Sequence, residues 1–125
     1  MDYVAGWYLK TLKGEIESDT KLNKTALINF GKEDISSYSY SLGMIMFQLL
    51  YEIIGEEDFN KCIRTYYNTY YAKGATTDEF VANTKRVTSV NLTDFFNDWI
   101  YTTEYLKYIR AGNTINEIKR MYRYQ

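Results

Sequence analysis

The 125-residue sequence has no histidine, no proline and only one cysteine, Cys62. A single cysteine cannot form an internal disulfide, which excludes a small disulfide-stapled secreted scaffold. The absence of histidine leaves Cys62 without the basic partner that a nucleophilic cysteine needs, so we expect this side chain to pack in the core. Because proline is absent, helices run without a built-in break, and glycines or caps must end them.

The sequence also lacks an excess of charge of either sign. It has 15 Lys and Arg and 16 Asp and Glu, with a formal net charge of -1. This balance argues against nucleic acid and anionic lipid as partners. We interpret the basic cluster at residues 119–123 as a solvated helix face. No run approaches the roughly 20 apolar residues of a membrane span, and residues 1–4 lack the character of a signal peptide. We therefore expect a soluble segment with no membrane span, in a compartment that the sequence does not indicate.

The apolar pattern is helical along most of the chain, and 46% hydrophobic content suffices for one continuous core. Residues 18–37 are mixed and polar, with a brief apolar run at 26–28 that suits a short helix. The predicted helices cover residues 4–17, 38–54, 56–72, about 77–87, 92–100 and 104–110, and a last one follows Asn113. The sequence thus predicts a single all-α domain over residues 1–125, a bundle of about six or seven helices.

The predicted helix from Tyr38 to Ile54 is apolar on all sides rather than along one stripe. Tyr40 and Phe47 mark one face, while Ile45 and Leu49 cover others. A helix that is hydrophobic all round is a buried one. At about 15 residues it is too short to span a bilayer comfortably. We therefore expect it to be the central, buried helix of the bundle.

Other helices show narrower stripes and recognisable starts. Thr76 with Glu79 has the capping-box arrangement. Asn91 and Asn113 are predicted to cap the two helices that follow them. The stripe of the first helix is predicted to be Val4, Trp7, Tyr8, Leu12 and Ile16.

The predicted helix that follows Gly55 contains an acidic cluster and a tyrosine cluster, and each has both a functional and a structural interpretation. The run Glu56-Glu57-Asp58 resembles paired catalytic carboxylates, but negative charge in a first helical turn complements the helix dipole, which we favour. A cluster of tyrosines could stack on sugars or bases, yet its helical spacing favours packing in the core and at its rim. These tyrosines are Tyr66, Tyr67, Tyr70 and Tyr71. The inward stripe of the helix is predicted to be Phe59, Cys62, Ile63, Tyr66 and Tyr70.

Four short patterns occur in one order over about half of the chain. They are Tyr40-Ser41-Leu42-Gly43, Gly55-Glu56-Glu57-Asp58-Phe59, Thr76-Thr77-Asp78-Glu79-Phe80 and Phe95-Phe96-Asn97-Asp98-Trp99. In order and spacing they resemble the region that follows the zinc site in aminopeptidase N-like zinc metallopeptidases of the gluzincin clan. The resemblance implies a C-terminal helical part of such an enzyme, which walls the substrate cleft.

In such enzymes the pattern tyrosine donates its hydroxyl to the oxyanion that forms when water attacks the peptide carbonyl. The resemblance assigns this role to Tyr40, with Tyr38 as the alternative register. A donor aimed at developing charge in a dry site contributes several kcal/mol to the transition state. Leu42 departs from the pattern, because the family usually has lysine there.

The resemblance also implies zinc and a peptide substrate in the whole enzyme. A His-Glu-x-x-His helix and a later glutamate hold the metal in this family. A chain without histidine cannot complete that site, so we expect no metal or cofactor in this segment and place zinc in a missing N-terminal catalytic half. That half is the expected partner, and the segment alone is expected to be inactive. The alternative hypothesis is a free-standing helical interaction module that binds a protein through its tyrosine-rich surface.

Overall fold

The computed structural model describes residues 2–35, 37–70, 74 and 76–122. In these residues it has seven α-helices and no β-strand, which confirms the all-α prediction. The α-helices are α1 (Asp2–Ser18), α2 (Ser37–Ile54), α3 (Glu56–Tyr70), α4 (Thr77–Val87), α5 (Thr93–Phe96), α6 (Tyr105–Arg110) and α7 (Ile115–Tyr122). Two 3₁₀ turns, η1 (Leu22–Lys24) and η2 (Leu27–Asn29), lie between α1 and α2, and a π-helical turn, η3 (Asn97–Tyr101), continues α5.

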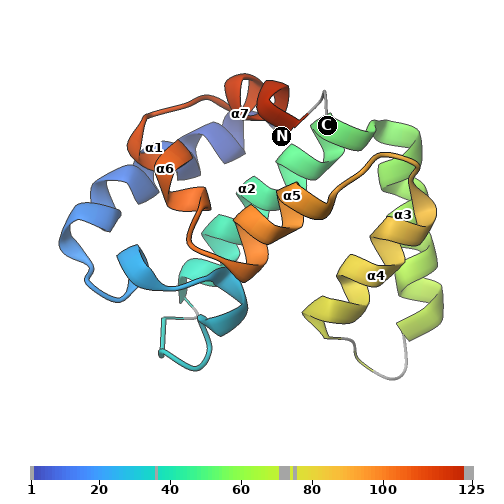
Figure 1. Ribbon diagram of the computed structural model, residues 1–125, viewed down its shortest axis with the longest axis horizontal. Helices are drawn as coiled ribbons and strands as arrows, with labels where there is room; N and C mark the ends of the chain where they lie inside the picture. Colours follow the sequence, from blue (N-terminus) through green and yellow to red (C-terminus); the bar gives the residue numbers. More distant parts are fainter. Residues whose placement is uncertain (1, 36, 71–73, 75, 123–125) are drawn as a thin grey trace.

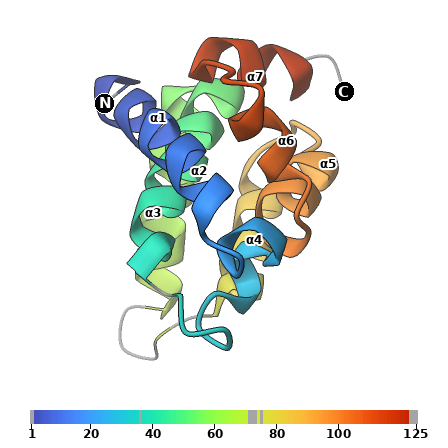
Figure 2. The ribbon, with the colours of Figure 1, turned by 90° about the vertical axis from the view of Figure 1, so that its left-hand side faces the viewer.

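The helices are arranged around α2. Helices α3 and α4 form an antiparallel hairpin at one end of the molecule, while α1, α6 and α7 gather at the other (Figure 1). Helix α1 runs alongside α2, and α7 packs on α2 as well (Figure 2). One hydrophobic core draws side chains from all seven helices. Its largest fully buried members include Trp99, Tyr105, Phe30, Phe95 and Phe96.

Helix α2 is central, but the prediction that it is buried on all sides is wrong at its first turns. Ile45 and Leu49 have no exposed surface, whereas Tyr40 is 66% exposed and Phe47 is half-buried. The neighbours of α2 are α1, α3 and α7. These three helices cover the middle and the end of α2 and leave the face at Tyr40 open.

The inward stripe of α1 also differs from the prediction. Val4 and Trp7 are 39% and 58% exposed, and Tyr8 is half-buried. Leu12 and Ile16 are buried as predicted, and Ala5 and Leu9 complete the core face at intervals of three and four residues. The large aromatic residues suggested the wrong face, because exposure depends on the partner helix and not on side-chain size alone.

Helix α3 buries less than its stripe predicts. Cys62 is fully buried, as expected, but Ile63 is 39% exposed and Tyr67 is 60% exposed. Among the described residues, α3 packs mainly on α2 and α4, and Ile63, one residue after Cys62, borders an open cavity between these helices instead of the closed core. Tyr66 is half-buried, with its ring edge-on to Phe80 at 5.3 Å. Tyr71 and the predicted end of this helix at Ala72 lie outside the described residues.

The predicted capping box at the start of α4 is confirmed. Glu79 N donates to Thr76 Oγ1 at 3.2 Å, and Thr76 N donates to Glu79 Oε1 at 2.9 Å. The predicted cap of the last helix is wrong, because Thr114 rather than Asn113 caps α7. Glu117 N donates to Thr114 Oγ1 at 3.2 Å, which leaves Asn113 in the loop before the helix.

The predicted cap of α5 at Asn91 is wrong, because Leu92 is the N-cap residue; the side chain of Asn91 accepts a hydrogen bond from Thr93 N at 3.0 Å from two residues before the helix begins. Among the described residues, no helix combines the length and the hydropathy that crossing a bilayer requires.

Candidate functional site

Tyr40 lies in the first turns of α2 and points into an exposed group of aromatic rings. Its ring meets the ring of Tyr8 edge-on, with centroids 5.9 Å apart and planes at 78°. Tyr8 in turn meets Trp7 at 5.0 Å and 71°. We call Trp7, Tyr8 and Tyr40 the Tyr40 surface. It joins α1 to α2, and Trp7 and Tyr40 are its most exposed members.

The hydroxyl of Tyr40 interacts with another phenol and not with a carboxylate. Burial raises the pKa of Tyr8, and the neighbouring charge of Tyr40 and a hydrogen bond between the two side chains raise it further. Tyr8 is therefore neutral at physiological pH. A hydrogen bond between an exposed phenol and a half-buried one is weak enough to be exchanged for a better acceptor.

Tyr38, the alternative register, is bound within the chain. Its hydroxyl lies 2.8 Å from Glu15 Oε2 and 3.0 Å from Asp19 Oδ2, and it has one proton for the two acceptors. The bond to Glu15 raises the pKa of Tyr38 well above its ordinary value, with burial and Asp19 adding to the effect. The two candidate tyrosines thus differ in what their hydroxyls contact, and only that of Tyr38 is held between carboxylates.

Leu42, which stands at the lysine position of the resemblance pattern, is only 1% exposed. It is part of the hydrophobic core, on a different side of α2 from Tyr40. A lysine at this place would bury a charge among apolar side chains, which is costly without a partner. The leucine is therefore a packing residue of this chain.

The other clusters considered from the sequence have structural explanations. In the acidic run at the start of α3, Asp58 accepts a hydrogen bond from Thr88 Oγ1 at 2.9 Å, while Glu56 and Glu57 are exposed. The thiol of Cys62 lies 2.9 Å from Thr84 Oγ1 in a buried contact between α3 and α4. Neither group lines either of the two cavities described below.

A cavity of about 350 Å³ opens beside the start of α2, next to Tyr40 in sequence but on another face of the helix. Ser39 lines it, together with Phe47, Ile63, Tyr66 and Phe80. No charged residue belongs to its lining. The cavity is mostly apolar and suits an uncharged side chain or a hydrophobic group. Sequence reasoning missed it, because its walls come from five separate segments.

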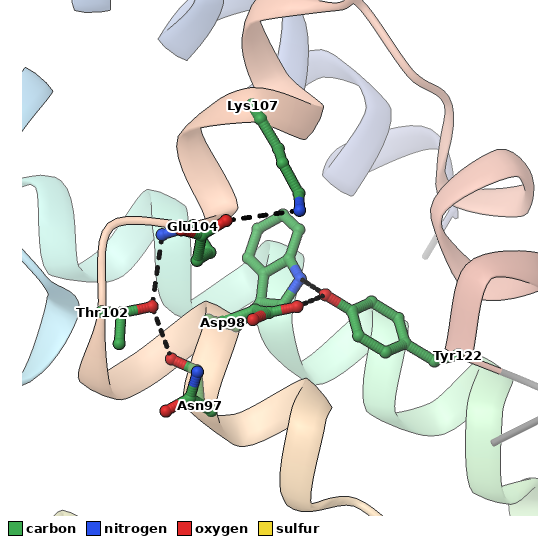
Figure 3. A network of polar contacts seen from close by, with 7 residues as sticks. Asn97, Asp98, Thr102, Glu104, Lys107 and Tyr122 are labelled. Carbon is green, nitrogen blue, oxygen red and sulfur yellow. Dashed lines mark hydrogen bonds and ion pairs between the residues drawn. The ribbon is translucent and has the colours of Figure 1, made fainter.

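The last of the four patterns, which ends at Trp99, is held by a polar network that the sequence did not indicate. Trp99 Nε1 donates to the Tyr122 hydroxyl at 3.1 Å, and that hydroxyl donates to Asp98 Oδ2 at 2.6 Å (Figure 3). The Tyr108 ring stacks on the indole at 5.9 Å and 12°. The network joins α7 to η3 and gives the indole N–H of Trp99 a hydrogen-bond acceptor.

The sequence model of the family described as Peptidase family M1 domain matches residues 15–99. This match covers more than half of the chain. The chain belongs to peptidase family M1. The matched range contains Tyr40 and all four short patterns, in agreement with the aminopeptidase N-like resemblance. No curated protein and no solved structure shows a significant match.

Zinc is the metal that M1 membership implies, and the side chains of this chain do not fit its site. The sequence has no histidine. Within the described part of the chain, no group of three or more Cys, Asp or Glu side chains is placed to hold a metal ion. A peptidase zinc site needs imidazole and carboxylate ligands on one cavity. These residues therefore cannot supply the imidazole ligands of a peptidase zinc site.

Proposed function

We propose that this M1 chain is the helical part of a metallopeptidase, that it walls one side of the substrate cleft, and that Tyr40 stabilises the oxyanion. The observation that carries this proposal is the contrast between two neighbouring tyrosines. Tyr40 is 66% exposed on α2 within the M1 match, whereas Tyr38 donates to carboxylates of the same chain.

The proposed chemistry is peptide hydrolysis. When a base in the proposed N-terminal half takes a proton from the attacking water, addition to the peptide carbonyl places a negative charge on the carbonyl oxygen, and the Tyr40 hydroxyl donates a hydrogen bond to that oxygen. A preorganised donor at such an oxyanion contributes about 3 to 4 kcal/mol when water is excluded. Tyr40 needs only to exchange its bond with Tyr8 for this stronger, charge-assisted one.

Exclusion of water requires a cover for the Tyr40 surface. Trp7 and Tyr40 expose aromatic rings side by side with Tyr8, and such clusters are typical of surfaces that bind a partner. The proposed partner is an N-terminal catalytic half of the same protein, with the peptide bound between the two parts. That half supplies the zinc ligands, so the 125 residues alone are inactive.

The test is the substitution Tyr40→Phe in the longer protein. Turnover should fall by about 10²- to 10³-fold with little change in KM, because the hydroxyl acts only on the transition state. Tyr38→Phe is the matched control, which removes a hydroxyl from the same helix and should leave turnover within about twofold of the parent enzyme. An unchanged rate in Tyr40→Phe would remove Tyr40 from the mechanism, and a selective loss in Tyr38→Phe would transfer the role to Tyr38.

The proposal that an N-terminal half supplies the zinc ligands has its own test. The 125-residue chain, purified alone, should neither bind stoichiometric zinc nor cleave aminoacyl amides. Either activity would show that the chain is not the inactive part of a larger enzyme.

A free-standing interaction module is the second candidate, because Trp7 and Tyr67 expose 58% and 60% of their surface. Such aromatic side chains are frequent anchors of protein interfaces. The reading frame upstream of Met1 distinguishes the two. A His-Glu-x-x-His motif followed by a glutamate supports the peptidase, and its absence upstream of a natural start at Met1 supports the module.

A further inference from the structure

A second cavity, of about 410 Å³, lies between α1 and the loop that joins α6 to α7. From α1 it is lined by Gly6, Leu9, Lys10 and Lys13, which share one helical face at spacings of three, four and seven residues. Tyr8 does not belong to this face, so the cavity is separate from the Tyr40 surface. The proposal that follows is independent of the M1 proposal.

The walls of this cavity are apolar. Leu9, Ile109 and Ile115 belong to the hydrophobic core and line the hollow. The space beside Gly6 is open, since a Cβ at that position would meet nothing within 4 Å. A volume of this size falls in the range of small-molecule sites, which are mainly apolar with a few polar groups at the edge.

The edge of the cavity is positively charged. Lys10 and Lys13 line it, no Asp or Glu does, and neither lysine forms an ion pair with a described residue. The Lys13 amine lies close over Gly112, 3.2 Å from where a Cβ would stand, and Gly112 has a φ of +72°. A glycine is needed here both for the turn and for this approach.

The polar side chains of the loop between α6 and α7 do not neutralise the positive charge of Lys10 and Lys13. Asn113 and Asn116 add amide side chains to the lining. Glu117, on the first turn of α7, turns its carboxylate to Thr114 N at 2.9 Å, and this bond lowers the pKa of Glu117. Its charge is engaged in capping α7 and does not pair with either lysine.

We propose that this cavity binds a small amphipathic carboxylate. The apolar body of the ligand lies against Leu9, Ile109 and Ile115, and its carboxylate is held by Lys10 and Lys13. A lysine pair that forms no ion pair with a described residue favours an anion, and an apolar floor favours a ligand whose charge lies at one end. Both a free aliphatic acid and the carboxyl end of a short hydrophobic peptide have this chemistry.

The test is a titration of the 125-residue chain with octanoate and, separately, with N-acetyl-trileucine. Binding is monitored through the NMR chemical shifts of the backbone amides of the protein. Saturable shifts should centre on Gly112 and Asn113, and the amide forms of both probes should bind at least about tenfold more weakly because they lack the charge. Binding of octanoate alone identifies a free acid as the ligand class, and binding of the peptide alone identifies a peptide carboxyl end.

Three variants distinguish a specific binding site from general attraction of an anion to lysines. The double variant Lys10→Gln/Lys13→Gln should lose at least about tenfold in affinity, whereas Lys24→Gln/Lys32→Gln, with the same charge change on other exposed lysines, should bind normally. Gly6→Leu should fill the hollow and abolish binding while circular dichroism stays helical. If neither carboxylate shifts Gly112, or if the first double variant binds as well as the second, the proposal is wrong.

Discussion

The indole of Trp99 donates its only N–H to the hydroxyl of Tyr122 at 3.1 Å, across 23 residues of sequence. Trp99 is the last residue of the M1 match, and Tyr122 lies in α7 beyond it. Both side chains are almost fully buried. The last helix therefore completes the core of the matched region.

Removal of this hydroxyl is expected to destabilise the fold. Tyr122→Phe leaves the buried indole N–H of Trp99 without an acceptor and Asp98 without its donor, so the free energy of unfolding should fall by about 1 to 3 kcal/mol. Urea denaturation measures the loss. Tyr101→Phe is the matched control, because it removes a tyrosine–aspartate hydrogen bond to Asp78 at an exposed position. An equal loss in both variants would show that burial of the Trp99 bond is unimportant.

Stability is expected to fall at alkaline pH. Burial raises the pKa of Tyr105 and Tyr122 above the ordinary value of 10.0, and hydrogen bonding to Glu15 raises that of Tyr38. Below pH 10 both the folded and the unfolded chain hold these protons, and the contribution to stability is complete. As pH rises toward the folded pKa values, only the unfolded state releases protons, so stability declines.

Two measurements check this alkaline loss. Denaturant unfolding at a series of pH values should show a decline that begins near pH 10, and near-ultraviolet absorbance should show that a subset of tyrosines ionises only on unfolding. In Tyr105→Phe, which also removes a bond to Thr25 O at 2.8 Å, the decline should be shallower. A pH-independent stability, or full ionisation of tyrosines in the folded protein, would contradict the prediction.

The capping box of α4 is expected to contribute measurably to stability. Thr76→Ala removes the acceptor of Glu79 N and should lower the free energy of unfolding by about 1 kcal/mol. Thr77→Ala, one residue later in the first turn, changes the same side chain where no capping bond exists. Thermal or urea unfolding of the two variants should differ by roughly the value of the cap. If Thr77→Ala were the more damaging change, the cap assignment would be wrong.

Cys62 is expected to be unreactive in the folded chain. Its side chain has no exposed surface, and its sulfur contacts Thr84 Oγ1 at 2.9 Å and Asn83 Nδ2 at 3.7 Å. A thiol reagent should modify it only as fast as the chain opens, and rapidly in denaturant. Fast labelling under native conditions would show that the α3–α4 hairpin opens readily.

The helices themselves were largely predictable. The starts and ends of α2 and α6 agree with the predicted ranges to within one residue, and the capping box at Thr76 was found from two residue types at a fixed spacing. Errors arose where the outcome depends on a neighbour. Trp7 was assigned to the core face of α1 and is exposed, and Asn113 was assigned a cap that Thr114 forms.

The candidate site shows the same limit. The motif order pointed to Tyr40 and left Tyr38 as an alternative register, and nothing in the pattern shows how the surroundings of the two hydroxyls differ. Their different environments come from α1, which brings Glu15 and Asp19 to one hydroxyl and Tyr8 to the other. No local pattern contains this information.

The sequence by itself determined the helical class, most helix boundaries and membership of the M1 family, because periodicity, caps and motif spacing are local properties of the chain. Tertiary structure decided that Tyr40 is exposed while the Tyr38 hydroxyl is hydrogen-bonded to a carboxylate. It also decided that Trp99 donates a hydrogen bond to Tyr122, and that Lys10 and Lys13 line an apolar cavity. Each of these depends on which helix faces which, and that choice is made by packing the whole core at once.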